Sequence, residues 1–436
     1  MTRALSRLAA AGIVALTASP AFAQPAKIDG ADTAWMIGAT GLVLMMTIPG
    51  LALFYAGMVR KKNVLATMAQ SLAATFLVSI LWAFVGYSLA FSGDGPWIGT
   101  LDRIFLHGIS ADSISPWAKT IPEALFMIYQ MTFAIITVAL VAGSVADRLR
   151  FSAYLIFCAL WLLLVYVPIA HWVWGGGFLG TYGVVDFAGG TVVHLSAGVA
   201  GVTAAYLIGT RRGYGHDNLA PYDLTLAVVG TGLLWVGWFG FNGGSAFGAN
   251  SRAVMAIVAT HLAASAGAIT WMALEWWTRG KPSVLGMISG AVAGLGTITP
   301  ASGFVMPMQA VLIGVIAGTI CFWACTSLKL KLGYDDSLDV FGVHGIGGFT
   351  GTLLAGVFAV AALSVGPDTP KGISGLLEGN PQQLVAQGYG VVVTGLWSAV
   401  LTAVILKVVG ALVPLRVKQE DEIIGLDVSQ HGEALQ

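Results

Sequence analysis

Two histidines lie inside apolar, glycine-rich stretches of the chain, where an ionisable side chain is costly. His194 stands in GGTVVHLSAG and His344 stands in DVFGVHGIGG. Ionisable residues inside a membrane find a partner or line a polar cavity, and they mark solute or proton pathways. A neutral imidazole both donates and accepts a hydrogen bond, so two of them could hold a small polar solute. The alternative is that each histidine is a core residue bonded to a neighbouring helix.

A second group of residues is aromatic, with a hydroxyl beside it. Its members are Phe133 in QMTFA, Trp174 in HWVWGGG, Trp238 and Phe241 in GWFGFNGGS, and the adjoining Ser245. Aromatic faces attract cations and a hydroxyl accepts hydrogen bonds from N–H donors, so the group suits a small ammonium-like ion. The alternative is an interfacial aromatic belt. A belt explains Trp271, Trp276 and Trp277 better than it explains aromatics placed among glycines.

Carboxylates near the ends of the apolar stretches allow two interpretations. Asp186, in DFAGG, could cap the helix that follows it and face the positive end of the helix dipole. It could also organise a cation site or accept the proton of the cation. Asp339, just before the stretch with His344, invites the same two interpretations. Glu123 and Glu275 fall near predicted helix ends, and we expect both to be solvated.

Membrane-spanning helices are needed to position these residues. Of the 436 residues, 57% are hydrophobic and 10% are charged, against about 25% charged in soluble domains. Apolar stretches of about 20 residues recur with brief polar breaks, as bilayer-crossing helices require. The composition predicts an all-α polytopic membrane protein of about eleven transmembrane helices. We place the spans near 32–58, 64–92, 121–146, 151–174, 189–210, 223–244, 252–278, 283–300, 305–330, 341–363 and 385–415.

The charge balance limits the partners of the chain. Lys+Arg and Asp+Glu number 21 each, which leaves no basic field for nucleic acid and no acidic field for cationic proteins. The expected partners are the lipid bilayer, small solutes and copies of the same chain. Cys158, Cys321 and Cys325 lie inside apolar runs and suggest neither a disulfide framework nor a metal site. We expect no cofactor.

The first residues and the loop charges predict the topology. Residues 1–23 read as a removable signal peptide, because Arg3 and Arg7 precede an apolar stretch and a small-residue cleavage point; a short uncleaved anchor is the alternative. Residues 24–416 then form the membrane domain and 417–436 a cytoplasmic tail. The N-terminus is expected outside, because cytoplasmic loops collect Lys and Arg. Alternate connections hold Arg60, Lys61, Lys62, Arg148, Arg150, Arg211, Arg212, Arg279, Lys281, Lys329 and Lys331, and the others only Arg103, Lys119, Arg252 and Lys371.

A weak internal repeat links the two histidines. Each is followed by glycine four and seven residues later, at Gly198 and Gly201 and at Gly348 and Gly351. A second match pairs Gly50, Phe54 and Gly57 with Gly237, Phe241 and Gly244. The offsets place the first span against the sixth and the fifth against the tenth. Two inverted five-helix repeats plus a final helix are therefore predicted, with the substrate path at the interface of the repeats.

At these residues the sequence resembles the ammonium transporter family, also called the Amt/Mep/Rh family, and particularly its bacterial Amt branch. The most specific segments are DRLRFSAYLIF at 147–157, HWVWGGG at 171–177, DFAGGTVVH at 186–194, GWFGFNGGSA at 237–246 and DVFGVHGIGG at 339–348. The resemblance implies a membrane channel or transporter for ammonium or ammonia in the bacterial cytoplasmic membrane, and not an enzyme. It also implies an eleven-helix homotrimer with a separate pore in each subunit.

The resemblance assigns roles to particular residues. Phe133, Trp174 and Ser245 match the family's outer recruitment site, and Phe133 with Phe241 matches its stacked gate. His194 and His344 match the pore histidine pair, and Asp186 matches the essential acidic residue.

The tail also has family character. GLDVSQHGE at 425–433 looks like the cytoplasmic segment that links neighbouring subunits and supports regulation by PII signalling proteins. The chain ends in Ala-Leu-Gln, without the tyrosine often found after that motif, which puts PII docking in doubt. Taken from composition alone, a polar tail of this length is disordered by default.

Other classes of membrane protein fit the motifs less well. A water or glycerol pore should carry paired Asn-Pro-Ala motifs, and an intramembrane enzyme should carry a motif such as His-Glu-x-x-His or Gly-x-Ser-x-Gly. The sequence contains none of these. An ammonium sensor with the same membrane domain is the alternative that remains, although such sensors usually append a signalling domain.

Overall fold

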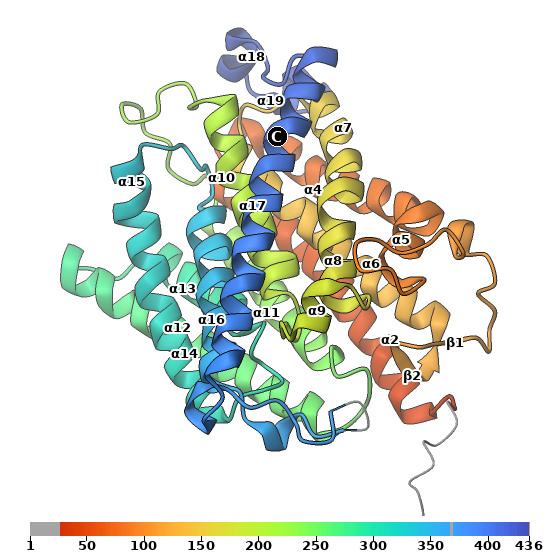
Figure 1. Cartoon of the computed structure of the whole chain (residues 1–436). Helices are drawn as coiled ribbons and strands as arrows, with labels where there is room; N and C mark the ends of the chain where they lie inside the picture. Colours follow the sequence, from red (N-terminus) through yellow and green to blue (C-terminus); the bar gives the residue numbers. More distant parts are fainter. Residues whose placement is uncertain (1–26, 367–368, 436) are drawn as a thin grey trace, which may run out of the picture.

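The computed structural model describes residues 27–366 and 369–435, and these residues are predominantly helical. The predicted signal peptide, 1–23, lies outside the described residues. Two short strands, β1 (Ile114–Ser115) and β2 (Ala118–Pro122), pair antiparallel. Figure 1 shows this hairpin toward one end of the helix bundle and the tail helices at the other end.

The first five apolar helical segments follow the predicted spans. Four of them contain π-helical turns, here called wide turns. They are α2 (Gly30–Met45) with α3 (Ala52–Met58); α4 (Val64–Leu81) with α5 (Tyr87–Phe91); α6 (Glu123–Val141); α7 (Phe151–Trp161) with α8 (Val167–Trp174) and α9 (Phe178–Tyr182); and α10 (Ser196–Ile208). The wide turns are Met46–Leu51, Trp82–Gly86, Leu162–Tyr166 and Gly190–Leu195, the last of which begins the fifth segment and holds His194.

The second half repeats the pattern. Its segments are α11 (Leu224–Gly244); α12 (Ser251–Arg279); α13 (Val284–Ile298); α14 (Pro307–Trp323) with α15 (Lys329–Leu332); α16 (Ile346–Phe358); and α17 (Pro381–Leu412). Wide turns at Ala324–Leu328 and Phe341–Gly345 precede α15 and α16, and the second of them holds His344. The tail forms α18 (Gln419–Ile424) and α19 (Leu426–His431).

Ten described helices are long and apolar enough to cross a membrane, and an eleventh apolar helix is shorter. The shorter helix, Val284–Ile298, lies where the eighth span was predicted to run from 283 to 300. It ends before Pro300, whose ring removes a backbone N–H and cannot continue a helix. The all-α polytopic fold is therefore confirmed, with one span shorter than the sequence indicated.

The helix neighbours follow the predicted repeat. Helix α11 packs against α2 and α3, which are the first span, and α16 packs against the turn that holds His194. Gly198 touches the backbone of Gly345, and a side chain at Gly198 would overlap it. Small residues thus let the two broken helices approach closely, as they do at other membrane helix contacts. This crossing brings the two histidine turns together.

Two glutamates expected to be solvated are buried. Glu123 accepts hydrogen bonds from Tyr87 Oη at 3.1 Å and Arg103 Nε at 3.0 Å. Glu275 accepts from the backbone N and the Oγ of Ser283, at 2.9 and 2.7 Å. The prediction was wrong because hydrophobic periodicity locates a helix end but says nothing about the loop that folds back over it.

The tail is ordered and packs on the membrane domain, so the default of disorder is wrong. Lys62 Nζ donates to the carbonyl oxygens of Glu422 and Ile423 at 2.6 and 2.7 Å. Asp427 accepts from the backbone N of Ala66 at 2.7 Å, near the start of α4. These contacts attach α18 and α19 to the loop between the first two spans (Figure 1).

Candidate functional site

Phe133, Trp174 and Ser245 line one cavity of about 350 Å³, here called the Trp174 cavity, whereas Trp238 and Phe241 border the smaller space beyond it. Phe133 comes from α6, Trp174 ends α8 and Ser245 follows α11. The rings of Phe133 and Trp174 are perpendicular, with centroids 5.9 Å apart. Trp174 Nε1 donates to the carbonyl of Asp186 at 2.8 Å, which fixes the indole. Ser245 Oγ donates to the carbonyl of Phe241 at 2.8 Å, so its lone pairs remain free to accept from a solute.

Below the Trp174 cavity, two phenylalanine rings close the path. Phe133 and Phe241 stack with centroids 4.1 Å apart and an interplanar angle of 19°. Beyond them lies a space of about 10 Å³, lined by aliphatic and aromatic side chains and by the two histidines. This volume is near the minimum for one water molecule. The segment is thus a narrow, largely apolar constriction.

His194 and His344 meet inside this constriction. Their Nδ1 atoms are 3.2 Å apart, and the rings are nearly parallel. Both side chains are buried, and His194 Nε2 has no hydrogen-bond partner in the described part of the chain. A bond between two Nδ1 atoms needs one donor and one acceptor. Two neutral rings therefore share a proton there, and one Nε2 becomes an acceptor and the other a donor.

Asp186 caps the turn that carries His194. Its two carboxylate oxygens accept from the backbone N atoms of Gly189, Gly190, Thr191 and Val192 at 2.6–3.1 Å, and from the Thr191 hydroxyl at 2.6 Å. Within residues 27–366 and 369–435, Asp186 forms no ion pair with a basic group. The structure therefore shows the capping interaction. The carboxylate also borders the Trp174 cavity.

Asp336, not Asp339, is the counterpart of Asp186. Asp336 precedes His344 by eight residues, as Asp186 precedes His194. It accepts from the backbone N of Phe341 at 2.7 Å, at the start of the second histidine turn. Asp339 instead has a left-handed backbone, with φ of 58°, and pairs with Lys329 Nζ at 2.8 Å. Sequence reasoning missed Asp336, although the shared eight-residue spacing carried the signal.

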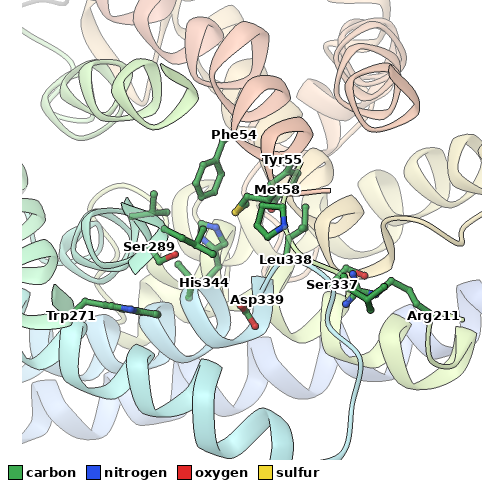
Figure 2. A pocket seen from close by; sticks show the side chains of 15 residues that line it. Phe54, Tyr55, Met58, Arg211, Trp271, Ser289, Ser337, Leu338, Asp339 and His344 are labelled. Atoms are coloured by element: carbon green, nitrogen blue, oxygen red, sulfur yellow. The ribbon is translucent and has the colours of Figure 1, made fainter. Parts of the chain in front are cut away.

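A second cavity, of about 160 Å³, lies on the other side of the histidine pair and is here called the Arg211 cavity. Figure 2 shows Phe54, Tyr55, Met58, Trp271, Ser289, His344 and Asp339 around it, with Ser337 and Arg211 at one side. Trp271 is buried, so the belt interpretation is wrong for it, whereas Trp276 and Trp277 are exposed. His344 borders both this cavity and the constriction. The two cavities and the constriction thus line up as one path.

Buried charges hold the loops around the Arg211 cavity. Arg211 Nη2 and Nε bond to the carboxylate of Asp335 at 2.7 and 3.0 Å. Burial alone would raise the pKa of Asp335, but the Arg211 guanidinium lowers it below its usual value. Arg148, fully buried, donates to the carbonyl of Asp335 at 2.6 Å and to Ser337 Oγ at 2.7 Å. This network ties the loops of the two repeats together at this end of the path.

Metal chemistry finds no support among the described residues, where no group of three or more His, Cys, Asp or Glu side chains could hold an ion. The site instead combines aromatic faces, hydroxyl and imidazole groups and one capped carboxylate. Such a site suits a small polar solute that is attracted to aromatic rings and also forms hydrogen bonds.

Comparisons with known proteins agree with this chemistry. A sequence model of the Ammonium Transporter Family matches residues 34–435. The ammonium transporter of Aquifex aeolicus is 47% identical over 427 residues, 97% of each chain, and that of Bacillus subtilis is 46% identical over 92% of this chain and 97% of its own. The crystal structure of Saccharomyces cerevisiae Mep2 has a TM-score of 0.83 and 36% identity over 90% of this chain and 88% of its own. A structure described as a sensor Amt protein has a TM-score of 0.83 and 29% identity over 92% and 98%.

Proposed function

The chain belongs to the ammonium transporter family, and from that premise we propose that ammonium binds in the Trp174 cavity, loses a proton, and crosses the constriction as ammonia along the histidine pair. The protein is a multi-pass membrane transporter for ammonium and not an enzyme. The observation that carries the mechanism is the 3.2 Å contact between the two Nδ1 atoms, placed midway between two cavities. The pair provides a polar binding site within the apolar constriction.

Recruitment is supported by the walls of the Trp174 cavity. The perpendicular rings of Phe133 and Trp174 form a corner, and ammonium can lie against a ring face of that corner. Ser245 Oγ offers an acceptor beside it. A cation–π contact contributes about 0.5–2 kcal/mol. Potassium gains the same attraction, but only ammonium can donate a hydrogen bond to the serine.

Deprotonation is supported by the constriction. Ammonium and potassium carry the same charge and have similar size, so a narrow pore separates them poorly. An intact cation between Phe133, Phe241 and the aliphatic wall would lose its hydration without compensating carbonyl oxygens. Ammonia has no such cost, and potassium cannot shed its charge. Loss of the proton therefore provides the selectivity.

The histidine pair then holds ammonia inside the constriction. The shared Nδ1 proton leaves one Nε2 as an acceptor and the other as a donor. Ammonia has N–H donors and one lone pair, so it can bond to both in turn. The parallel indole of Trp238, 5.4 Å from the His194 ring centroid, fixes the plane of the imidazole.

We expect Asp186 to act through its negative charge and not as the base that accepts the proton. A carboxylate offers about four acceptor sites, and the five hydrogen bonds to Asp186 already use all of them. A sixth donor would have little room. The residue therefore stabilises the cation from the wall of the cavity and fixes the His194 turn, while another acceptor, such as water, takes the proton.

A sensor with the same membrane domain is the second candidate. The likeness to the sensor Amt structure, with a TM-score of 0.83, favours it. A sensor needs the ammonium-binding cavity but not a conducting constriction. Transport by the purified protein therefore separates the two functions.

The proposal also covers the membrane, the assembly and the partners of the chain. We place the chain in the bacterial cytoplasmic membrane as a homotrimer, with the N-terminus and the Trp174 cavity outside and the tail in the cytoplasm. The Lys and Arg distribution supports this orientation. A PII signalling protein is a candidate partner at the face formed by α18 and α19. A reporter that works only in the cytoplasm should therefore be active when it is fused after Gln436, and a reporter that works only outside the cytoplasm should be inactive there.

The test is current recording on proteoliposomes fused to a solid-supported membrane. Ammonium uptake should saturate with concentration, and potassium should not be taken up; a current that accompanies the uptake would show that the released proton also crosses. Uptake without current would indicate net ammonia. Binding of ammonium with neither uptake nor current would contradict transport and favour the sensor.

A further inference from the structure

One arginine of the Trp174 cavity has no role in the steps above. Arg252 lies in the first turn of α12 and borders the cavity together with Trp174 and Ser245. The central carbon of its guanidinium lies 4.8 Å from the centroid of Phe187 and 4.7 Å from that of Phe304, and these two ring centroids are 5.7 Å apart, so both rings contact one side of the group. Its Nε donates to the carbonyl of Gly303 at 3.0 Å. The side chain is therefore fixed in place.

No described carboxylate neutralises the charge of Arg252. No carboxylate among the described residues forms an ion pair with it, and neither Nη group has a hydrogen-bond partner there. The first turn of a helix carries the positive end of its dipole, which disfavours a cation. Among residues 27–366 and 369–435, Asp186 is the only carboxylate that borders the same cavity, and its oxygens are bonded to its own segment. The cavity thus contains fixed N–H donors and an uncompensated positive charge.

We infer that Arg252 binds a small monovalent inorganic anion, such as chloride, inside the Trp174 cavity. The Nη groups are the donors, because Gly303 takes Nε and no described acceptor takes either Nη. The anion must be small, because Phe187 and Phe304 wall this part of the cavity with apolar surface. The anion is monovalent, because the single guanidinium supplies one positive charge to balance it.

The inference rests on the proposed recruitment of ammonium in the same cavity, and it adds a coupling between the two ions. An anion at Arg252 attracts a cation at Trp174, and without the anion Arg252 repels that cation. By linkage, each ion raises the affinity for the other by the same factor. Unit charges about 10 Å apart in a watery cavity support a roughly two- to fivefold effect. Arg252 therefore makes ammonium recruitment depend on the anion outside.

The first test compares ammonium chloride with ammonium gluconate at equal ionic strength on proteoliposomes. Gluconate is too bulky for the site, so the half-saturating ammonium concentration of the unmodified protein should rise about two- to fivefold. Arg252→Gln should show one value in both salts. Lys371→Gln removes a positive charge from an exposed residue that does not line the cavity, and it should keep the full difference. An equal chloride effect in Arg252→Gln and the unmodified protein would overturn the inference.

The second test detects the anion without transport. Crystals of the full chain soaked in sodium bromide should show an anomalous peak beside the Arg252 guanidinium, and crystals of Arg252→Gln should lack it. Retained size-exclusion profile and thermal midpoint would establish that the variant is folded. Absence of a peak at Arg252 in the unmodified protein contradicts the anion site even if ammonium transport is confirmed. A peak with neither ammonium uptake nor ammonium current would instead contradict the proposed function and leave the anion site intact.

Discussion

The two histidine turns begin alike and differ in the charges around them. Asp186 and Asp336 each stand eight residues before their histidine and cap its turn. Asp186 accepts five hydrogen bonds, and no described basic group pairs with it. Asp336 accepts from Phe341 and leaves Oδ1 without a partner, with Lys329 bonded to its backbone carbonyl at 2.6 Å.

The two turns share a structural role, which is to position a histidine, and they differ in the cation site that we propose. The repeat supplies the same helix start twice and so brings the imidazoles together at the crossing of Gly198 and Gly345. Only the Asp186 copy borders a cavity with aromatic walls. The Asp336 copy lies with Lys329 and Asp339, whose opposite charges largely cancel. One end of the path therefore favours a cation, and the other end does not retain it.

The largest expected effect is that of Asp186→Asn. An amide oxygen can replace only part of the five bonds, and its NH₂ group would face backbone donors, so we expect a loss of about 3–5 kcal/mol in unfolding free energy. Ammonium current should fall to background. Asp223→Asn is the matched control, because Asp223 is a partly buried cap of α11 and Asn caps as well as Asp. Equal thermal midpoints for the two variants would contradict the special role of Asp186.

Asp336→Asn should have a smaller effect. The variant keeps an acceptor for Phe341 N and removes a buried charge, but Lys329 loses a nearby anion. We expect a loss of about 1–2 kcal/mol in unfolding free energy. The half-saturating ammonium concentration should stay unchanged, because this residue is remote from the Trp174 cavity. A changed half-saturation at normal stability would show that the two copies share the cation-binding role.

Trp174→Leu tests the aromatic wall, although it also removes the hydrogen bond from Trp174 Nε1 to the carbonyl of Asp186. Loss of the cation–π contact should cost about 0.5–2 kcal/mol of binding, which corresponds to a roughly 2- to 30-fold rise in half-saturating ammonium. The maximal current and the protein yield should be retained. Trp277→Leu is the control, since Trp277 is 84% exposed. Unchanged concentration dependence in Trp174→Leu would support the belt interpretation.

The smallest effect is a pH dependence of stability at the Asp336 end. Burial raises the pKa of Asp336 above its usual 3.8, and Lys329 opposes this only partly. A raised folded-state pKa stabilises the fold at low pH, and this contribution is lost as pH rises through that pKa. The unmodified protein should therefore gain thermal stability relative to Asp336→Asn as pH falls toward about 4. A difference between the two midpoints that does not change with pH would contradict the assignment.

Sequence reasoning located what depends on local pattern. Glycine spacing predicted the neighbours of the first and fifth spans, and the aromatic motifs located Phe133, Trp174 and Ser245, which line the Trp174 cavity. It failed where a distant loop decides the environment. Ser283 buries Glu275, and Arg103 with Tyr87 buries Glu123.

The same limit applies to charges inside the path. The left-handed backbone at Asp339 turns its carboxylate to Lys329 and leaves the capping position to Asp336. Arg252 could be placed in a loop between spans, but its two aromatic neighbours come from segments 65 and 52 residues away in the chain, at Phe187 and Phe304. No periodicity predicts such a contact.

The histidine pair is the centre of the account, and its removal is the most direct test. Ammonium and potassium currents would be compared in matched proteoliposomes of the unmodified protein, His194→Ala, His344→Ala, the double variant and His194→Asp, each with a normal size-exclusion profile. Since the two rings share one proton, the single changes should impair ammonium current or its selectivity, and the double change should cost less than their sum. His194→Asp places a fixed anion in the constriction and should admit potassium. A double alanine variant that conducts ammonium at the unmodified rate and still excludes potassium would contradict the mechanism and leave His194 and His344 as packing residues.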